Sequence, residues 1–298
     1  MGAWEKGGWQ PNADDPLAKP IAMAIHAAIA RATILFDAEK PARPSGLGYR
    51  GRSPENLMST GKFCWFDLMS TDVPAARAFY TELFGWDIRE HNAQYAMIHD
   101  RAGRGLGGMM AANPGQPSAW LPYVTTDDIA ITMNRVRELG GKVFMEHDAP
   151  EVGKFAIYAD PQGAALAAIQ LKNDTGNYPR EKGENHIAWS ELNTTDPAAA
   201  LAFHAGVFDW KSESWGPDYI LVGDEHSAGI TRGQPGVPSN WLVYVNSQNT
   251  DATVAKVESL GGKVMMPGTD IPNIGRFAVF ADPTGGVFAV MQSFPKPE

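Results

Sequence analysis

The sequence predicts an α+β protein of two tandem domains with the same βαβββ–βαβββ plan, preceded by a partly helical N-terminal extension. Three observations lead to this prediction: long stretches of the chain repeat, each repeat alternates short strands with single helices, and the first 60 residues match neither copy. Strand, helix and three strands, used twice in one domain, can pair into a curved sheet that forms a cleft with the helices outside.

The repeat is seen in two long matched stretches. Residues 61–86, GKFCWFDLMSTDVPAARAFYTELFGW, match residues 185–210, NHIAWSELNTTDPAAALAFHAGVFDW. Further on, residues 153–170, GKFAIYADPQGAALAAIQ, match residues 275–292, GRFAVFADPTGGVFAVMQ. Shorter matches lie between them in the same order, so the pattern indicates a duplicated domain.

The limits of the repeat predict the domain boundaries. The first copy is expected at residues 61–172 and the second at 185–298, and the polar, turn-rich segment at 173–184 is interpreted as a linker. Residues 1–60 form the extension, in which the Ala- and Ile-rich stretch after Pro20 predicts one helix.

Each element of the first copy has a local signal. CWFDLMS is a short aromatic and apolar run typical of a strand. The next helix is expected to be capped at its N-terminus by Thr71 or Asp72, to carry Pro74 in its first turn and to end at Gly85. The runs YAMIHD and GLGGMMAA read as strands. The second half repeats the plan with the strand WLPYVTT, the helix DDIAITMNRVRELGG and three further strands.

The composition is that of an acidic globular protein. The net charge of −9 argues against nucleic acid or an anionic membrane as the main partner, because both require a basic surface. The single cysteine, Cys64, allows no intramolecular disulfide and fits a reducing compartment. No run is long and apolar enough to span a membrane and no signal pattern opens the chain, so a cytoplasmic location is expected.

The order of elements, the helix ending FYTELFGW and the DPxG turns resemble the vicinal oxygen chelate superfamily. This superfamily includes glyoxalases, extradiol dioxygenases, fosfomycin-modifying enzymes and bleomycin-sequestering proteins. The resemblance covers about residues 61–294 and implies the fold described above. It leaves the chemistry open, because this fold hosts unrelated functions.

The resemblance also implies three metal-ligand positions in each copy, and all of them are apolar here. They are a first-strand position, a position on the first strand of the second half, and a position seven residues after the Asp of the DPxG turn. The residues that occupy them are Trp65, Leu121 and Ala167 in the first copy, and Trp189, Leu242 and Ala289 in the second. None of these side chains can donate a lone pair to a cation, so we expect no metal and no other cofactor.

Strand alternation predicts which side chains face the clefts. Asp67 and Glu191 are expected there as candidate catalytic acids or bases, because a carboxylate among apolar walls has a raised pKa. A structural role, with each carboxylate satisfied by a neighbouring donor, is the alternative. His99 is a third catalytic candidate, confined to the first copy because Gly223 is its counterpart.

The remaining cleft-facing positions are predicted to bind a ligand, since aromatic walls with few polar anchors suit a small organic molecule. These residues are Trp65, Met69, Tyr123, Thr125, Trp189, Asn193, Tyr244 and Asn246. The same alternation places Cys64, Phe66 and Leu68 under the helices. His186 is expected at a strand edge and not as a metal ligand.

These features support several functional hypotheses. The first is a metal-independent protein that binds a small, aromatic or polyfunctional metabolite, with acid–base isomerase, lyase or cyclase chemistry. The second is a non-catalytic binding or sequestering protein of the bleomycin-resistance type. The third is a metal-dependent glyoxalase-like or dioxygenase-like enzyme with other ligands, and the fourth is a structural protein with filled clefts. The expected partner is a small molecule, and the N-terminal extension could bridge a homodimer.

Overall fold

The computed structural model describes residues 60–172, 183–215, 218–223 and 227–295, together with two short paired strands near the N-terminus, β1 (Trp4–Glu5) and β2 (Gly8–Trp9). The helix predicted after Pro20 and most of the predicted linker lie outside the described residues.

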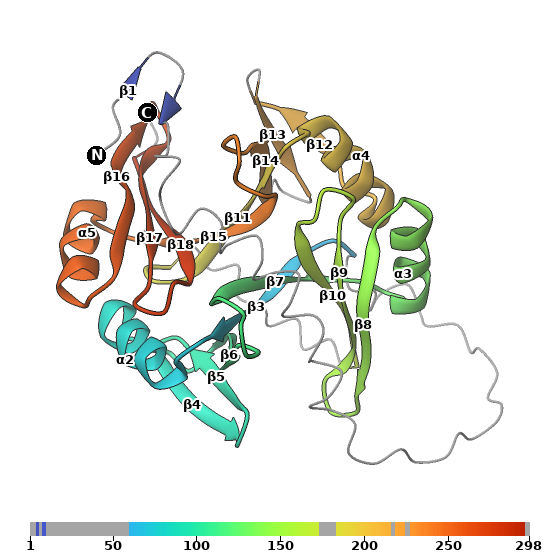
Figure 1. Cartoon of the computed structure of the whole chain (residues 1–298), viewed down its shortest axis with the longest axis horizontal. Coiled ribbons are helices and arrows are strands. Elements are labelled where there is room, and N and C mark those ends of the chain that lie inside the picture. Colours follow the sequence, from blue (N-terminus) through green and yellow to red (C-terminus); the bar gives the residue numbers. More distant parts are fainter. Residues whose placement is uncertain are drawn as a thin grey trace.

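The two copies contain the same series of elements, which confirms the predicted fold class (Figure 1). The first copy consists of β3 (Phe63–Ser70), α2 (Val73–Phe84), β4 (Asp87–Asn92), β5 (Tyr95–His99), β6 (Gly105–Ala111), β7 (Ala119–Thr125), α3 (Ile129–Glu138), β8 (Lys142–Ala149), β9 (Gly153–Ala159) and β10 (Ala165–Leu171). The second consists of β11 (Ile187–Thr194), α4 (Pro197–Phe208), β12 (Ser212–Ser214), β13 (Tyr219–Val222), β14 (Ala228–Arg232), β15 (Asn240–Asn246), α5 (Thr250–Ser259), β16 (Lys263–Ile271), β17 (Gly275–Ala281) and β18 (Val287–Ser293).

Each copy forms one eight-stranded sheet. The strand order is β4-β5-β6-β3-β7-β10-β9-β8 in the first sheet and β12-β13-β14-β11-β15-β18-β17-β16 in the second. The two halves of a copy meet at one central antiparallel pair, β3 with β7 and β11 with β15. This pairing brings the first strand of each half together in the middle of the sheet, where the predicted site residues lie.

The ends of α2 follow from local chemistry. The Asp72 carboxylate accepts a hydrogen bond from the Ala75 N–H at 3.0 Å and so satisfies one of the free donors at the helix start. The helix ends at Gly85, whose φ of 68° is left-handed and therefore favours glycine. Both predicted ends are confirmed.

The helices of the two copies pack in crossed pairs. α2 of the first copy lies beside α5 of the second, and α3 lies beside α4 (Figure 1). One core therefore joins the first half of copy 1, including Phe79 and Trp86, to residues of copy 2 such as Phe280 and Phe288. A second core joins the second half of copy 1 to the first half of copy 2. Neither core belongs to one copy alone.

The DPxG turns also reach across to the other copy. Asp282 in copy 2 accepts a hydrogen bond from the Tyr80 hydroxyl of copy 1 at 3.0 Å, and the Trp120 indole N–H donates to the same hydroxyl at 3.1 Å. In the equivalent turn of copy 1, Asp160 lies 3.5 Å from His204 Nε2 of copy 2, and both side chains are fully buried. Each crossed core therefore holds an acid of one copy close to a polar ring of the other, with hydrogen bonds at Asp282 and a longer contact at Asp160.

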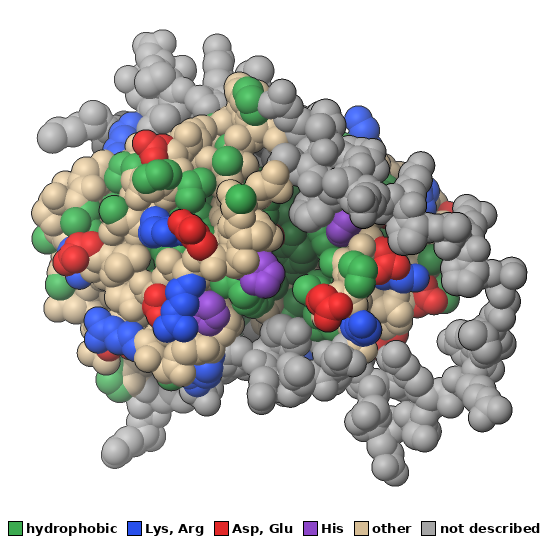
Figure 2. All heavy atoms as spheres, turned by 90° about the horizontal axis from the view of Figure 1, so that it is seen from below, with side chains coloured by type: hydrophobic (Ala, Val, Ile, Leu, Met, Phe, Trp, Pro, Cys, Tyr) green, Lys and Arg blue, Asp and Glu red, His purple; other side chains and the backbone are tan. Residues whose placement is uncertain are grey.

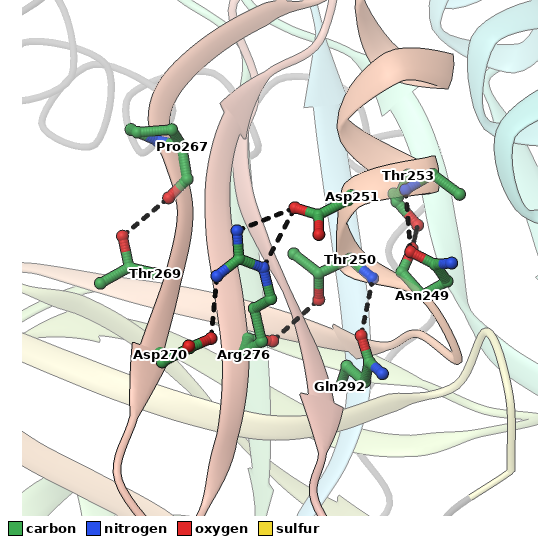
Figure 3. A network of polar contacts seen from close by, with 10 residues as sticks. Asn249, Thr250, Asp251, Thr253, Pro267, Thr269, Asp270, Arg276 and Gln292 are labelled. Atoms are coloured by element: carbon green, nitrogen blue, oxygen red, sulfur yellow. Dashed lines mark hydrogen bonds and ion pairs between the residues drawn. The ribbon is translucent and has the colours of Figure 1, made fainter.

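Side chains from neighbouring strands hold the start of α5 (Figure 3). The Gln292 side-chain carbonyl accepts the Thr250 N–H at 3.1 Å, and the Thr250 hydroxyl donates to the Arg276 backbone carbonyl at 2.8 Å. The Arg276 guanidinium bridges Asp251 and Asp270 at 2.9 and 2.8 Å on the outer surface. Gln170 plays the same part for α3, where it accepts the Ile129 N–H at 3.1 Å.

None of the helices in the described part of the chain is both long enough and apolar enough to cross a membrane.

Candidate functional site

We call the face of each sheet that is turned away from the helices its inner face. In copy 1 an apolar cluster separate from the crossed cores covers this face, and it includes Leu121, Tyr123 and Ile157 with Trp65 and Met69 beside them. A smaller cluster covers the inner face of copy 2. In the space-filling view one side of the molecule is hollowed near its middle, with hydrophobic side chains in its depth (Figure 2).

A bulge in β3 decides which residues reach the inner face. Phe63 pairs with Val124 and Trp65 pairs with Tyr123, so Cys64 is an extra residue in the ladder. As a result Cys64 belongs to the inner-face cluster and lies 3.6 Å from the Tyr123 carbonyl. The prediction that Cys64 packs under the helices is therefore wrong, because strict alternation takes no account of a bulge.

Beyond the bulge the alternation holds. Phe66 and Leu68 lie in the crossed core under the helices, as predicted. Asp67 and Trp65 lie on the opposite face, paired with Leu121 and Tyr123 of β7. The inner face of copy 1 thus brings the Trp-x-acid motif of the first strand next to the tyrosine of the second half.

Asp67 is the centre of a closed set of hydrogen bonds. Its Oδ1 accepts the Trp65 indole N–H at 2.9 Å and the Tyr95 hydroxyl at 2.8 Å, and its Oδ2 accepts the Tyr123 hydroxyl at 2.8 Å. The backbone of Gly108 donates a further hydrogen bond. Because a carboxylate has about four lone-pair positions, these donors use its capacity, and Asp67 is only 3% exposed.

Burial dominates the electrostatics of this cluster. It raises the pKa of the Asp67 carboxyl even though the hydrogen bonds from Tyr95, Tyr123 and Trp65 act in the opposite direction. Burial and the neighbouring Asp67 also raise the pKa of Tyr123 well above its ordinary value. The pKa of Tyr95 is raised for the same reasons, so the hydroxyls of both tyrosines remain protonated and donate to Asp67.

Copy 2 carries a related but more open arrangement around Glu191. Glu191 Oε2 accepts the Tyr219 hydroxyl at 2.9 Å, and Oε1 accepts the Tyr244 hydroxyl at 3.0 Å. The Trp189 indole N–H donates to the Tyr219 hydroxyl at 3.2 Å, whereas the Trp65 indole N–H in copy 1 is shared between the Tyr95 hydroxyl at 3.0 Å and the carboxylate itself at 2.9 Å. Glu191 is half-buried, and burial raises its pKa.

A glycine makes room for one tyrosine in each arrangement. A Cβ placed on Gly108 would lie 1.9 Å from the Tyr95 hydroxyl, and a Cβ on Gly229 would lie 2.1 Å from the Tyr219 hydroxyl. Any larger residue at either position would displace the tyrosine from its acid.

The sequence reasoning missed Tyr95 and Tyr219. Both open the third strand of their copy, β5 and β13, and YAMI in copy 1 corresponds to YILV in copy 2. The signal that could have found them is the repeat itself, since a tyrosine is kept at matching positions of two otherwise different strands. The carboxylates, Trp65, Trp189, Tyr123 and Tyr244 do come together as predicted.

The other residues predicted to bind a ligand differ in where their side chains lie and in what they contact. Met69 borders the inner-face cluster, and Asn193 donates a hydrogen bond to Glu191. Thr125 is buried and accepts the Lys62 N–H at 3.0 Å, and Asn246 donates to the Gly183 carbonyl at 3.2 Å, so both hold the start of the neighbouring strand. A role for these residues in ligand binding stays a prediction.

His99 lies on the inner face of copy 1. It pairs with Gly105 across the β5–β6 ladder, and a Cβ on Gly105 would lie 3.0 Å from the Trp65 ring. Paired residues of an antiparallel ladder point to the same side, so His99 shares this side with Trp65. Among the described residues, the buried His99 Nδ1 has no hydrogen-bond partner, and a catalytic role for His99 stays a prediction.

His186 lies at the junction of the copies. Its Nε2 lies 2.9 Å from Asp100 Oδ2 and 3.2 Å from Arg104, both in the turn between β5 and β6. A cavity of about 230 Å³ adjoins these residues and Trp86. His186 thus takes part in a contact between copies and is remote from the acid of its own sheet.

The residues at the family's metal positions do not fit a metal ion. Trp65, Leu121 and Ala167 converge on the inner face of copy 1, and Trp189, Leu242 and Ala289 do so in copy 2. Indole, isobutyl and methyl groups supply no ligand atom. Throughout the described ranges, no three His, Cys, Asp or Glu side chains gather as a metal-binding group.

Comparison with known proteins identifies the family. A family model described as a glyoxalase-like domain matches residues 65–169. The "Putative glyoxylase CFP32" of Mycobacterium tuberculosis is 34% identical over 249 residues, which cover 78% of this chain and 95% of the relative. The chain belongs to the glyoxalase-like family of the vicinal oxygen chelate superfamily. The tandem domains of this glyoxalase-like protein are therefore those of the superfamily.

Further relatives agree with this assignment. The anthracycline biosynthesis protein DnrV of Streptomyces peucetius is 33% identical over 131 residues, covering 35% of the glyoxalase-like chain and 45% of the relative. The Mn(II)-bound glyoxalase from Novosphingobium aromaticivorans matches in structure with a TM-score of 0.58 at 16% identity, over 80% of this chain and 85% of the other. An extradiol ring-cleaving dioxygenase from B. fuscum matches with a TM-score of 0.59 at 13% identity, over 82% and 76% of the chains. These structural matches show the fold alone.

Proposed function

We propose that this glyoxalase-like protein binds a small organic molecule, aromatic or polyfunctional, on the inner faces of its sheets, without a metal at the family's usual positions. The observation that carries the proposal is the arrangement of one carboxylate, one indole and two tyrosine hydroxyls, which occurs in both copies. Apolar walls with a few fixed polar groups are typical of small-molecule sites.

The named relatives support an organic ligand. One relative carries the name of a glyoxylase and another that of an anthracycline biosynthesis protein. Anthracyclines are aromatic compounds, so the second name agrees with aromatic walls such as those formed by Trp65, Tyr123 and Phe155, the last two with ring centres 6.1 Å apart.

The test is calorimetric titration of EDTA-treated full-length protein with 2-naphthol. We expect binding that EDTA leaves unchanged and that Trp65→Leu and Trp189→Leu each weaken about fivefold or more, because each removes a ring from one inner face. Phe294→Leu, a partly exposed aromatic residue beyond the end of β18, is the matched control and should bind as the wild type does. Binding that EDTA abolishes and Mn²⁺ restores would overturn the metal-independent proposal, and so would one metal atom per chain in freshly purified protein.

Acid–base chemistry is a second candidate function. It is favoured by Glu191, a half-buried carboxylate whose pKa burial raises toward the range useful for proton transfer. The test is NMR-detected exchange of the C–H protons of 2-indanone with deuterium from D₂O. Faster exchange with the wild type than with Glu191→Gln supports this function, and equal rates contradict it.

A further inference from the structure

Glu191 lies among several aromatic rings of copy 2. Trp189, Tyr219 and Tyr244 reach it directly or through one hydroxyl. Two more rings extend this wall: Trp215 lies 6.0 Å from the Tyr219 ring and Phe277 lies 6.5 Å from the Tyr244 ring. These rings lie around a half-buried carboxylate, and the faces of such rings attract cations.

Within the part of the chain that the structure describes, the groups that donate hydrogen bonds to Glu191 are all neutral. Its hydrogen-bond donors are Tyr219, Tyr244 and Asn193. Over the described ranges, no Lys, Arg or His side chain forms an ion pair with Glu191. Even a half-buried carboxylate loses part of its hydration, and a cationic ligand would offset that loss.

The strand pairings show which other charged residues share this inner face. Glu213 pairs with Leu221 on the same side as Tyr219, at the near edge of the sheet, where β13 and β14 separate its strand β12 from β11. Lys263 pairs with Ala281 at the far edge of the sheet, and three strands separate β16 from β11. In the described strands, the side chains next to Glu191 on this face are therefore aromatic or neutral, and the charged residues lie toward the two edges of the sheet.

The acid of copy 1 differs in its access. Asp67 is one methylene shorter than Glu191, is only 3% exposed and receives an additional hydrogen bond from the Trp65 indole. In copy 2 the Trp189 indole donates to Tyr219 and not to Glu191. The Glu191 carboxylate accepts from Tyr219, Tyr244 and Asn193, so one of its about four lone-pair positions remains for an incoming donor.

From these observations we propose that the inner face of copy 2 binds a small organic cation, an ammonium group carried on an aromatic framework, with Glu191 as its counter-ion. The inference rests on the proposed function, since it requires that the inner faces bind small organic molecules. The ammonium donates to Glu191 while the surrounding rings stabilise its charge through cation–π contacts. In copy 1 Asp67 is enclosed, so the inner face of this copy binds uncharged ligands.

A matched pair of probes tests the proposal. Tryptamine and tryptophol share the indole ring and the two-carbon arm, and they differ in an ammonium against a hydroxyl. In calorimetric titrations of the full chain at neutral pH, we expect tryptamine to bind at least about tenfold more tightly than tryptophol. In Glu191→Gln this difference should disappear while the tryptophol affinity is kept, which also shows that the variant is folded.

Glu258→Gln is the control for net charge, because Glu258 is an exposed carboxylate on α5. It should keep the wild-type preference for tryptamine. Equal affinities of the wild type for the two probes would overturn the cation proposal and leave the proposed function standing. A preference that survives in Glu191→Gln would overturn Glu191 as the counter-ion. Absence of binding by both probes would overturn the cation proposal, and the 2-naphthol titration then decides separately on the proposed function.

Discussion

At the scale of single residues, the two copies differ in how they satisfy one buried carboxylate. In copy 1 the shorter Asp67 accepts the indole N–H and both tyrosine hydroxyls, and it is nearly inaccessible. In copy 2 the longer Glu191 accepts hydrogen bonds from both tyrosine hydroxyls but not from the indole. The acid that is one methylene group longer is thus half-buried, whereas the shorter one is enclosed.

The glycine beside Tyr95 provides a first prediction. Gly108→Ala should lower the free energy of unfolding by about 2–4 kcal/mol, because its Cβ would lie 1.9 Å from the Tyr95 hydroxyl and force it away from Asp67. Urea denaturation measures this loss. Adding Tyr95→Ala removes the clashing group, so the double variant should lose clearly less than the sum of the single losses. Strict additivity would show that the steric contact is not the cause.

The raised pKa of Asp67 gives a prediction about pH. The folded protein holds this proton to a higher pH than the unfolded chain, whose Asp pKa is about 3.9. The contribution of Asp67 to the free energy of unfolding is therefore most favourable below about pH 4 and declines as the pH rises through the raised pKa. The stability of the wild type relative to Asp67→Asn should fall over this range in urea denaturation series. Glu258→Gln, at an exposed position, should follow the wild type, and a wild-type advantage that grows with pH would contradict the sign.

The site could be predicted in part from the sequence. Alternation correctly brings Trp65 and Asp67 to the inner face of the first sheet, and Trp189 and Glu191 to that of the second. It can be predicted because the period of two along a strand is a local property. The hydrogen bonds from Tyr95 and Tyr219 depend on which strands become neighbours, and on a glycine opposite each tyrosine. That information is non-local, so a reading of single strands does not contain it.

At the scale of elements, caps and bulges decide where the regular pattern begins and ends. Asp72 and Gly85 are visible in the sequence because their roles are local. The bulge between Phe63 and Trp65 is not, since nothing in CWF distinguishes an extra residue from a paired one. Cys64 is consequently on the inner face, where strict alternation does not place it.

The glutamines that hold the starts of α3 and α5 provide a prediction at this scale. Gln170 and Gln292 each accept one backbone N–H that the helix cannot satisfy itself, at 3.1 Å in both copies. Gln170→Met and Gln292→Met should each lower the free energy of unfolding by about 1 kcal/mol, and the two losses should add because the sites are separate. Chemical denaturation checks this against Gln94→Met, an exposed turn residue whose replacement should have little effect. An equal loss in all three variants would rule out capping as the cause.

At the scale of the whole molecule, the two copies form one folding unit. The duplication and the order of elements could be predicted, because the two copies have similar sequences in the same order. The crossed pairing of α2 with α5 and of α3 with α4 could not, since an apolar helix face does not specify which apolar surface it will meet. The contacts of Asp282 with Tyr80 and of Asp160 with His204 belong to this same level.

Cutting the chain within residues 173–182 tests this interdependence. The two fragments, produced together with a tag on one of them, should co-purify and unfold in a single cooperative transition, because each core takes residues from both copies. Each fragment alone should lack a stable monomeric fold, as judged by near-ultraviolet circular dichroism and sedimentation. A fragment that folds alone as a monomer would contradict the crossed cores.

The crossed cores also divide the ways in which the two repeats can diverge in evolution. A substitution under the helices, such as a change at Tyr80 or His204, alters a contact with the other repeat and must be matched there. Inner-face residues such as Asp67, Glu191 and His99 face only their own sheet and escape this constraint. Substitutions are thus tolerated more easily on the two inner faces, so these faces can come to differ from each other while the shared cores keep both repeats folded.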